Sequence, residues 1–176
     1  MFRVIVTFML ACLAGLIVQA TLVHSISPYA IAPDFIVILA LYLGLKVQNP
    51  AGVLGAFLLG VAGDFASAQF VGPTAAGAVV VYGLTVIVSS KIYAEHPFTM
   101  AMLALFCSLA DSFTYVLMVG FYVDVNLLTA AVFRGIGIEA ALTALVAPFV
   151  IKLLELSVSE SINPAKYNND SLRRIR

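Results

Sequence analysis

Long apolar runs, broken only by short polar stretches, dominate this 176-residue chain. Hydrophobic residues make up 62% of it and charged residues 10%, and the mean hydropathy is +1.09. Such a composition is typical of a polypeptide whose main solvent is a lipid bilayer, where helices satisfy the backbone polar groups internally. The runs predict an all-α polytopic membrane protein with six transmembrane helices, at residues 4–23, 35–47, 51–70, 74–88, 98–123 and 127–154.

The basic residues predict the direction in which these helices are threaded. From an inside N-terminus, no Lys or Arg falls in an outside loop, whereas the inside ends hold Arg3, Lys46, Lys91, Lys152, Lys166, Arg173, Arg174 and Arg176. Lys and Arg close to helix ends set orientation because they resist translocation. Both termini are therefore expected on the cytoplasmic side.

The N-terminal segment admits a second interpretation. Arg3, the apolar stretch 4–18 and the tripeptide Val18-Gln19-Ala20 imitate a secretory signal peptide with a small-residue cleavage site. We favour an uncleaved first helix, because the apolar run continues through residues 21–23.

Small residues recur at helical spacing in the first and third predicted helices, at Ala11, Gly15, Gly52, Gly55, Gly60 and Gly63. In lipid, helices associate through close packing of small residues, since the hydrocarbon provides no hydrophobic driving force between them. The pattern predicts that the third helix is the most enclosed. It also makes these residues a candidate docking surface for the transmembrane helix of a partner.

Four ionisable residues within the predicted helices form a candidate polar centre: Asp64, Asp111, Arg134 and Glu139. A charge in mid-membrane costs at least about 2.5–3.5 kcal/mol on insertion scales, so each must be paired, neutralised or hydrated. At about 1.5 Å per residue, Arg134 would lie roughly 12 Å deep, within reach of either aspartate. We expect Arg134 to pair with Asp111 or Asp64, and the pair either orders the helices or lines a polar cavity.

No catalytic, metal or cofactor site is expected. Cys12 and Cys107 lie in apolar runs as small packing residues, and His24 and His96 lie in loops on opposite sides, so metal-ligand spacing is absent. No nucleophile is accompanied by a base. The formal net charge of zero leaves no basic face for nucleic acid. The chain is therefore predicted not to be an enzyme.

Several short motifs follow one another along the chain: Pro33-Asp34 opens the second predicted helix, Asp64 lies late in the Gly-rich third one, and Gly72 lies in the turn after it. These motifs resemble the rod shape-determining protein MreD family. In that family the second helix opens with a Pro-Asp pair, and a Gly-rich third helix ends in an Asp that precedes a Gly-containing turn. The matching positions, with two in the last helix, are Pro33, Asp34, Gly60, Asp64, Gly72, Arg134 and Pro148. The run Gly-Asp-Phe-Ala-Ser-Ala around Asp64 departs from the more aliphatic family pattern. The resemblance covers nearly the whole chain in length and in helix order.

This resemblance implies an inner-membrane component of the bacterial elongation (rod) complex. The implied fold is similar to the substrate-binding subunits of energy-coupling-factor transporters. The implied main partner is the bitopic protein MreC, alongside the MreB filament, the RodA glycosyltransferase and a penicillin-binding transpeptidase. The expected function is a non-enzymatic scaffold that supports peptidoglycan synthesis and rod cell shape. The alternative is a small-molecule (vitamin or ion) binding membrane subunit of a transporter, with its pocket at the polar centre.

The C-terminal segment differs in composition from the rest of the chain. We expect a transmembrane domain over residues 1–156 and a polar, basic tail over 157–176. The tail is either a solvated end or a contact for anionic membrane lipids or a cytoplasmic partner such as the MreB filament, because basic residues beside a membrane are attracted to an anionic surface.

Overall fold

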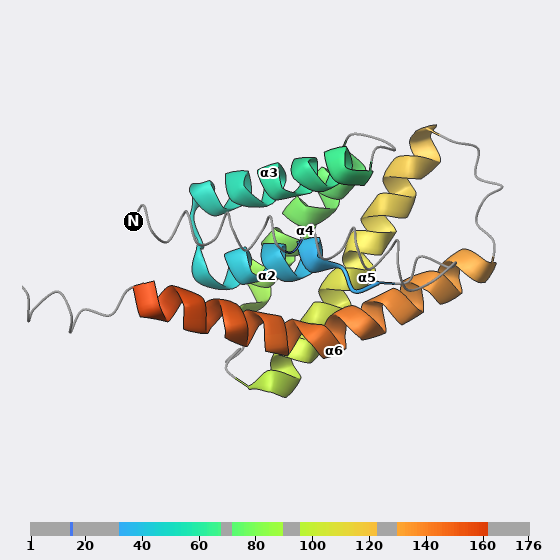
Figure 1. Cartoon of the computed structure of the whole chain (residues 1–176). Helices are drawn as coiled ribbons and strands as arrows, with labels where there is room; N and C mark the ends of the chain where they lie inside the picture. Colours follow the sequence, from blue (N-terminus) through green and yellow to red (C-terminus); the bar gives the residue numbers. More distant parts are fainter. Residues whose placement is uncertain (1–14, 16–31, 68–71, 90–95, 123–129, 162–176) are drawn as a thin grey trace, which may run out of the picture.

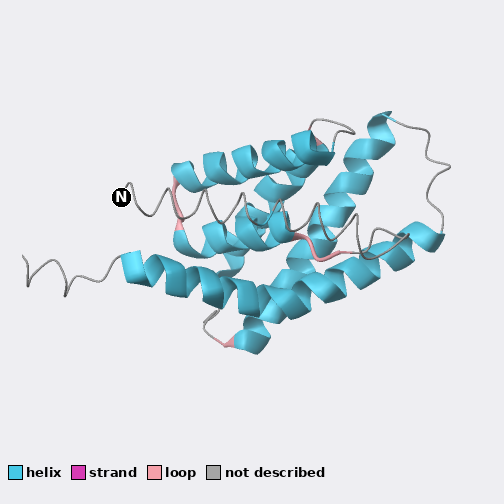
Figure 2. Cartoon of the chain, viewed as in Figure 1, coloured by secondary structure: helices cyan, strands magenta, loops and turns pink. Residues whose placement is uncertain are grey.

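The computed structural model describes Gly15 and residues 32–67, 72–89, 96–122 and 130–161. This part of the chain is all-α, with five helices joined by loops (Figure 2). The helices are α2 (Phe35–Lys46), α3 (Pro50–Ser67), α4 (Pro73–Ser89), α5 (Pro97–Tyr122) and α6 (Ala130–Ser161). The first predicted helix lies outside the described residues except at Gly15, which is helical.

The predicted positions of the second to fifth helices agree closely with α2–α5. Proline stands at the first helical position of α3, α4 and α5, where its missing N–H needs no partner and its fixed φ favours the helix. α6 is described from Ala130 and continues to Ser161, so the expected boundary at residue 156 falls within a helix. Three helices, α3, α5 and α6, are long and apolar enough to cross a membrane, and α2 and α4 are shorter apolar helices.

The short helix α2 lies at the centre of the described bundle. Figure 1 shows it between α3 and α6, and it contacts α4 and α5 as well. Every residue from Ile36 to Gly44 is buried. An apolar helix of 12 residues is too short for a hydrocarbon core of about 30 Å, and its neighbours shield it from lipid. The prediction that the third helix is the most enclosed is therefore wrong, because one face of α3 is open at Leu54, Leu58 and Phe65.

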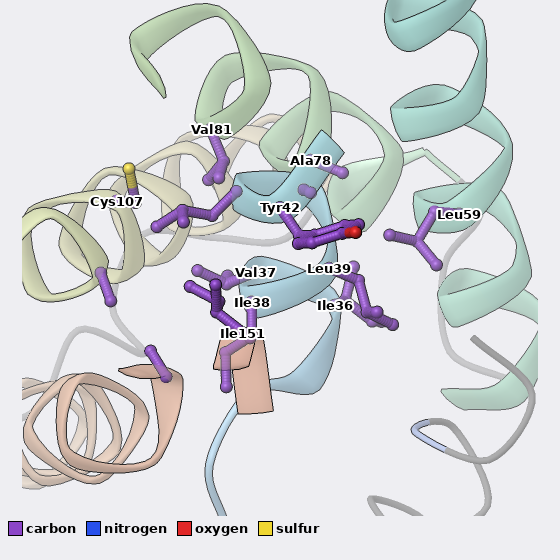
Figure 3. Close-up of a cluster of buried hydrophobic side chains, with 14 of the residues drawn as sticks. Ile36, Val37, Ile38, Leu39, Tyr42, Leu59, Ala78, Val81, Cys107 and Ile151 are labelled. Atoms are coloured by element: carbon purple, nitrogen blue, oxygen red, sulfur yellow. The ribbon is translucent and has the colours of Figure 1, made fainter. Parts of the chain in front are cut away.

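Branched apolar side chains fill the space around α2. Val37 and Ile38 of α2 belong to one buried cluster with Val81 of α4, Cys107 of α5 and Ile151 of α6 (Figure 3). Each of these five side chains is almost completely inaccessible. Cys107 thus acts as the small packing residue that its apolar surroundings predict. The core therefore packs α4, α5 and α6 against α2, the described helix that has no free face.

The outward surfaces of the other helices are apolar. Leu54 of α3, Ile87 of α4, Phe106 of α5 and Leu145 of α6 are each more than half exposed. Contiguous apolar surface of this kind is unusual on a soluble monomer, whereas in a bilayer it contacts solvent of matching polarity. The fold therefore agrees with the membrane environment that the composition predicts.

Polar contacts mark one end of the bundle, which we call the Lys46 end. Lys46 Nζ lies 2.7 Å from Glu155 Oε1, and Gln48 Nε2 donates to Ser89 Oγ at 2.9 Å. These contacts bring the C-terminal parts of α2, α4 and α6 together. The opposite end, where Gly72 precedes α4, is called the Gly72 end. Both partners of the Lys46–Glu155 pair are partly exposed, so the pair contributes about 1 kcal/mol at most.

Candidate functional site

Four carboxylates gather toward the Gly72 end, and we call them the acidic cluster: Asp34, Asp64, Asp111 and Glu139. Asp111 lies close enough to the other three for their charges to interact, and Glu139 is similarly close to Asp34. The four residues come from four different segments, namely the start of α2, α3, α5 and α6. The structure thus brings together the three acidic members of the predicted polar centre and adds Asp34.

Asp64 caps the N-terminus of α4 from the neighbouring helix. Its Oδ2 accepts hydrogen bonds from the backbone N–H of Gly72 (2.8 Å) and Ala75 (3.2 Å), and its Oδ1 accepts from Thr74 N–H (3.0 Å). The first N–H groups of a helix have no partner within it, and a carboxylate there also interacts favourably with the helix dipole. The side chain is only 2% exposed. Asp64 therefore holds α3 and α4 together.

Two features of the local sequence require this arrangement. Gly72 and Pro73 open α4, so the helix has no side-chain cap of its own at its start. Gly72 also adopts φ +123°, a left-handed conformation that favours glycine. The acceptor must then come from elsewhere, and Asp64 provides it. Glycine directly before Pro73, where Ser, Thr, Asp or Asn would supply a side-chain cap, is the sequence signal from which this cap is predictable.

Asp34 caps α2 and connects it to α6. Its Oδ1 accepts from Ile36 N–H (2.8 Å) and Val37 N–H (3.3 Å), which is the usual geometry of an N-cap aspartate. Its own N–H donates to Thr143 Oγ1 at 2.9 Å. The N-terminus of α2 is thus anchored beside the middle of α6. The position of Asp34 directly before an apolar run already indicates a cap, but Thr143 is not recognisable from the sequence.

Asp111 contacts the backbone of α4 and not a cation. A Cβ built on Gly77 would lie 3.0 Å from Asp111 Cγ, so the carboxyl group occupies the space that a larger residue at 77 would fill. Among the described residues, no hydrogen bond or ion pair involves this carboxylate. An uncompensated charge in an apolar environment is costly. Neither packing nor helix capping therefore explains why an aspartate is present at position 111 of the acidic cluster.

The expected ion pair of Arg134 is not formed. Arg134 is exposed on α6, and within the described residues it has no ion pair with either Asp64 or Asp111. Backbone donors already occupy both oxygens of Asp64. Among the described residues, a Cβ added at Gly135 or Gly137 would meet nothing within 4 Å, so there is open space beside this turn. Arg134 does not belong to the acidic cluster.

The candidate docking glycines face other helices of the same chain. A Cβ on Gly60 would lie 2.6 Å from the Thr74 carbonyl oxygen, and one on Gly52 would lie 2.6 Å from Tyr82 Oη. Gly63 is buried against Ile36, Gly55 lies beside Leu43, and Gly15 lies beside Leu39. Close internal packing therefore accounts for Gly52, Gly60 and Gly63, whereas a Cβ on Gly15 or Gly55 would make ordinary contacts. Ala11 lies outside the described residues.

The described part of the chain contains no group of three or more His, Cys, Asp or Glu residues arranged to hold a metal ion. A site for a single metal ion is therefore not assigned to the acidic cluster. The arrangement does two things: it caps two helices, and it places the carboxyl groups of Asp111 and Glu139 beside those caps.

An all-α bundle that turns apolar faces outward and caps its helices internally defines a polytopic membrane protein. The chain matches the family model described as rod shape-determining protein MreD over residues 1–157. It belongs to this family of membrane proteins, whose role is structural and lies in determining rod shape. No curated protein and no solved structure matches the chain.

The motif positions that carried the family resemblance have identifiable structural roles. Asp34 and Asp64 cap α2 and α4, Gly60 permits close contact of α3 with α4, and Gly72 forms the left-handed turn. Pro33 is half-buried next to the first cap, and Pro148 lies inside α6, which continues through it. Pro33 and Asp34 thus lie where α2 begins, and Gly60, Asp64 and Gly72 lie where α3 meets the start of α4.

Proposed function

We propose that this chain is a non-enzymatic scaffold of the bacterial rod complex, which binds MreC and supports peptidoglycan synthesis. Membership of the MreD family carries this proposal. The described surface supports it, because α3–α6 present apolar faces and the α2–α3 connection is only three residues long. A protein with so little surface in water acts through its membrane-embedded faces and its rims.

The proposal predicts a cellular phenotype and a partner. Depletion in a rod-shaped host is expected to make the cells round, because the elongation complex loses a component. The intact protein in mild detergent is expected to retain tagged MreC. An unrelated bitopic protein of similar length serves as the capture control. Rod-shaped depleted cells that no longer take up a vitamin or an ion would contradict the scaffold function.

We also propose an inner-membrane location with both termini in the cytoplasm, which places the Lys46 end inside and the Gly72 end outside. The helix directions support this assignment, since Lys46 and Lys152 both lie toward the Lys46 end. MreB, RodA and the transpeptidase are proposed as further members of the same complex.

The topology can be tested by cysteine labelling in a background without Cys12 and Cys107. The exposed residue Ser67 ends α3 at the Gly72 end, whereas exposed Asn49 precedes α3 at the Lys46 end. A membrane-impermeant reagent added to intact spheroplasts is expected to label Ser67→Cys and not Asn49→Cys. Permeabilised cells should show labelling of both. The reverse pattern would invert the orientation.

The acidic cluster favours one alternative function, a transporter subunit that binds a cationic small molecule. Four neighbouring carboxylates, with no basic partner at Asp111 among the described residues, would suit such a ligand. Native mass spectrometry of the purified protein distinguishes the two functions. A stoichiometric amine that dissociates from the Asp111→Asn variant would support transport, whereas ligand-free protein that retains MreC would support the scaffold.

A further inference from the structure

One face of α6 is apolar between two cations, Arg134 and Lys152. The exposed residues follow one another at intervals of three or four along this face: Arg134, Ile138, Ala141, Leu145, Phe149 and Lys152. The opposite side packs into the bundle through Ala140, Thr143, Ala144, Ala147 and Ile151, all of them buried. We call the exposed set the α6 outer face.

The separation of the two cations matches the thickness of a bilayer. Arg134 and Lys152 are eighteen residues apart, which corresponds to about 27 Å along an α-helix. The hydrocarbon core of a typical membrane is about 30 Å thick. Arg and Lys keep their stems in apolar surroundings while their charged heads reach the headgroup region. Neither cation then needs a protein partner in the hydrocarbon.

A protein occupant fits this face less well than lipid. Two copies crossing in parallel through their α6 outer faces would bring one Arg134 close to the other, and like charges repel. A partner helix packed over Arg134 would keep its guanidinium from the headgroup phosphates, whereas phospholipids supply phosphates at both ends of the face. The turn around Arg134 is also open, with nothing within 4 Å of a Cβ at Gly135 or Gly137.

We propose that the α6 outer face lies against phospholipid acyl chains, with Arg134 among the phosphates of one leaflet and Lys152 among those of the other. The two residues then mark the boundaries of the membrane. This holds whichever side faces outward, and it does not depend on the proposed scaffold function.

The proposal changes how α2 is placed in the membrane. Thr143 is nine residues from Arg134 and nine from Lys152, so it lies midway, roughly 14 Å from each boundary. Asp34 donates its N–H to Thr143, and α2 therefore begins near the centre of the bilayer and ends at the Lys46 end. α2 is then a half-membrane helix. The polar start of such a helix is tolerated only inside protein, which agrees with the burial of α2.

The chain contains no tryptophan, so single-tryptophan variants report depth without background. The intact protein is reconstituted in phosphatidylcholine vesicles whose acyl chains carry bromine either near the headgroup or near the chain end. Fluorescence of the Leu145→Trp variant is expected to be quenched more strongly by the deep bromine. Fluorescence of the Phe133→Trp variant, next to Arg134, is expected to be quenched more strongly by the shallow bromine.

Two further measurements complete the test. In the Phe133→Trp background, Arg134→Leu is expected to shift quenching toward the deep bromine, and Arg134→Lys is expected to preserve the shallow pattern. Leu145→Trp fluorescence that no brominated lipid quenches would overturn the proposal. Quenching that disappears when MreC is co-purified would also overturn it and would assign the α6 outer face to a partner helix.

Discussion

The Gly60→Leu variant is expected to yield little folded protein, whereas Gly83→Leu should accumulate to the wild-type level. A Cβ at Gly60 would lie 2.6 Å from the Thr74 carbonyl oxygen and 2.8 Å from Ala75 N. These atoms belong to the backbone of α4, which cannot rotate away as a flexible side chain does. Overpacking typically costs about 1–3 kcal/mol and sometimes more, and rigid opposing atoms place this site at the upper end.

Gly83 is the matched control, because it lies in α4 and a Cβ there would meet nothing within 4 Å. The measurement is the monodisperse peak of a fluorescent fusion on size exclusion in detergent, before and after heating. A folded Gly60→Leu variant that no longer retains MreC would contradict this expectation. Such a result would support the alternative that Gly60 forms part of a docking surface for the transmembrane helix of MreC.

The Asp64→Ala variant is expected to lose roughly 3 kcal/mol of folding free energy, because one buried and two part-buried backbone N–H groups lose their acceptor. Asp64→Asn should have an intermediate effect. It keeps one acceptor oxygen but turns an NH₂ donor toward N–H groups that need an acceptor. The thermal midpoint in detergent, measured by the same size-exclusion assay, is expected to be highest for the wild type, lower for Asp64→Asn and lowest for Asp64→Ala.

Asp111→Asn is the matched control, since it neutralises another aspartate of the same acidic cluster. Asp111 has no hydrogen bond or ion pair within the described residues and interacts with three other carboxylates. Its replacement is therefore expected to leave the thermal midpoint unchanged or to raise it. Asp111→Asn that destabilises the protein as strongly as Asp64→Ala would show that Asp111 has a structural partner.

The same contrast separates structure from function within the acidic cluster. Asp34 and Asp64 each satisfy helix N–H groups, so their presence is explained by folding alone. Asp111 has no such task. A buried carboxyl group that has no hydrogen bond or ion pair within the described residues is a candidate for a residue retained for activity at a cost in stability. Asp111→Asn in the depletion strain would show whether the rod complex needs that carboxylate.

The sequence predicted the positions of the second to fifth helices well, because its signals for them are local. A proline at the first position of α3, α4 and α5 marks where each helix begins, and the apolar runs mark their lengths. The Pro-Asp and Gly-Asp motifs indicated the MreD family, and the match over residues 1–157 confirms it. Gly60 was also recognisable as a site of close helix contact, although not which helix it contacts.

Which helix lies at the centre was decided only by the tertiary structure. In water, apolar periodicity separates the inner face of a helix from its outer face, but in lipid both faces are apolar and the pattern loses this information. α2 is apolar on all sides, as a lipid-exposed helix would be, yet it is enclosed by four others. The sequence pattern also does not show which groups the charged residues contact. Charge and depth suggested that Asp64 pairs with Arg134. In the structure α3 crosses α4, so Asp64 accepts hydrogen bonds from the α4 backbone, and Arg134 lies on the outer face of α6.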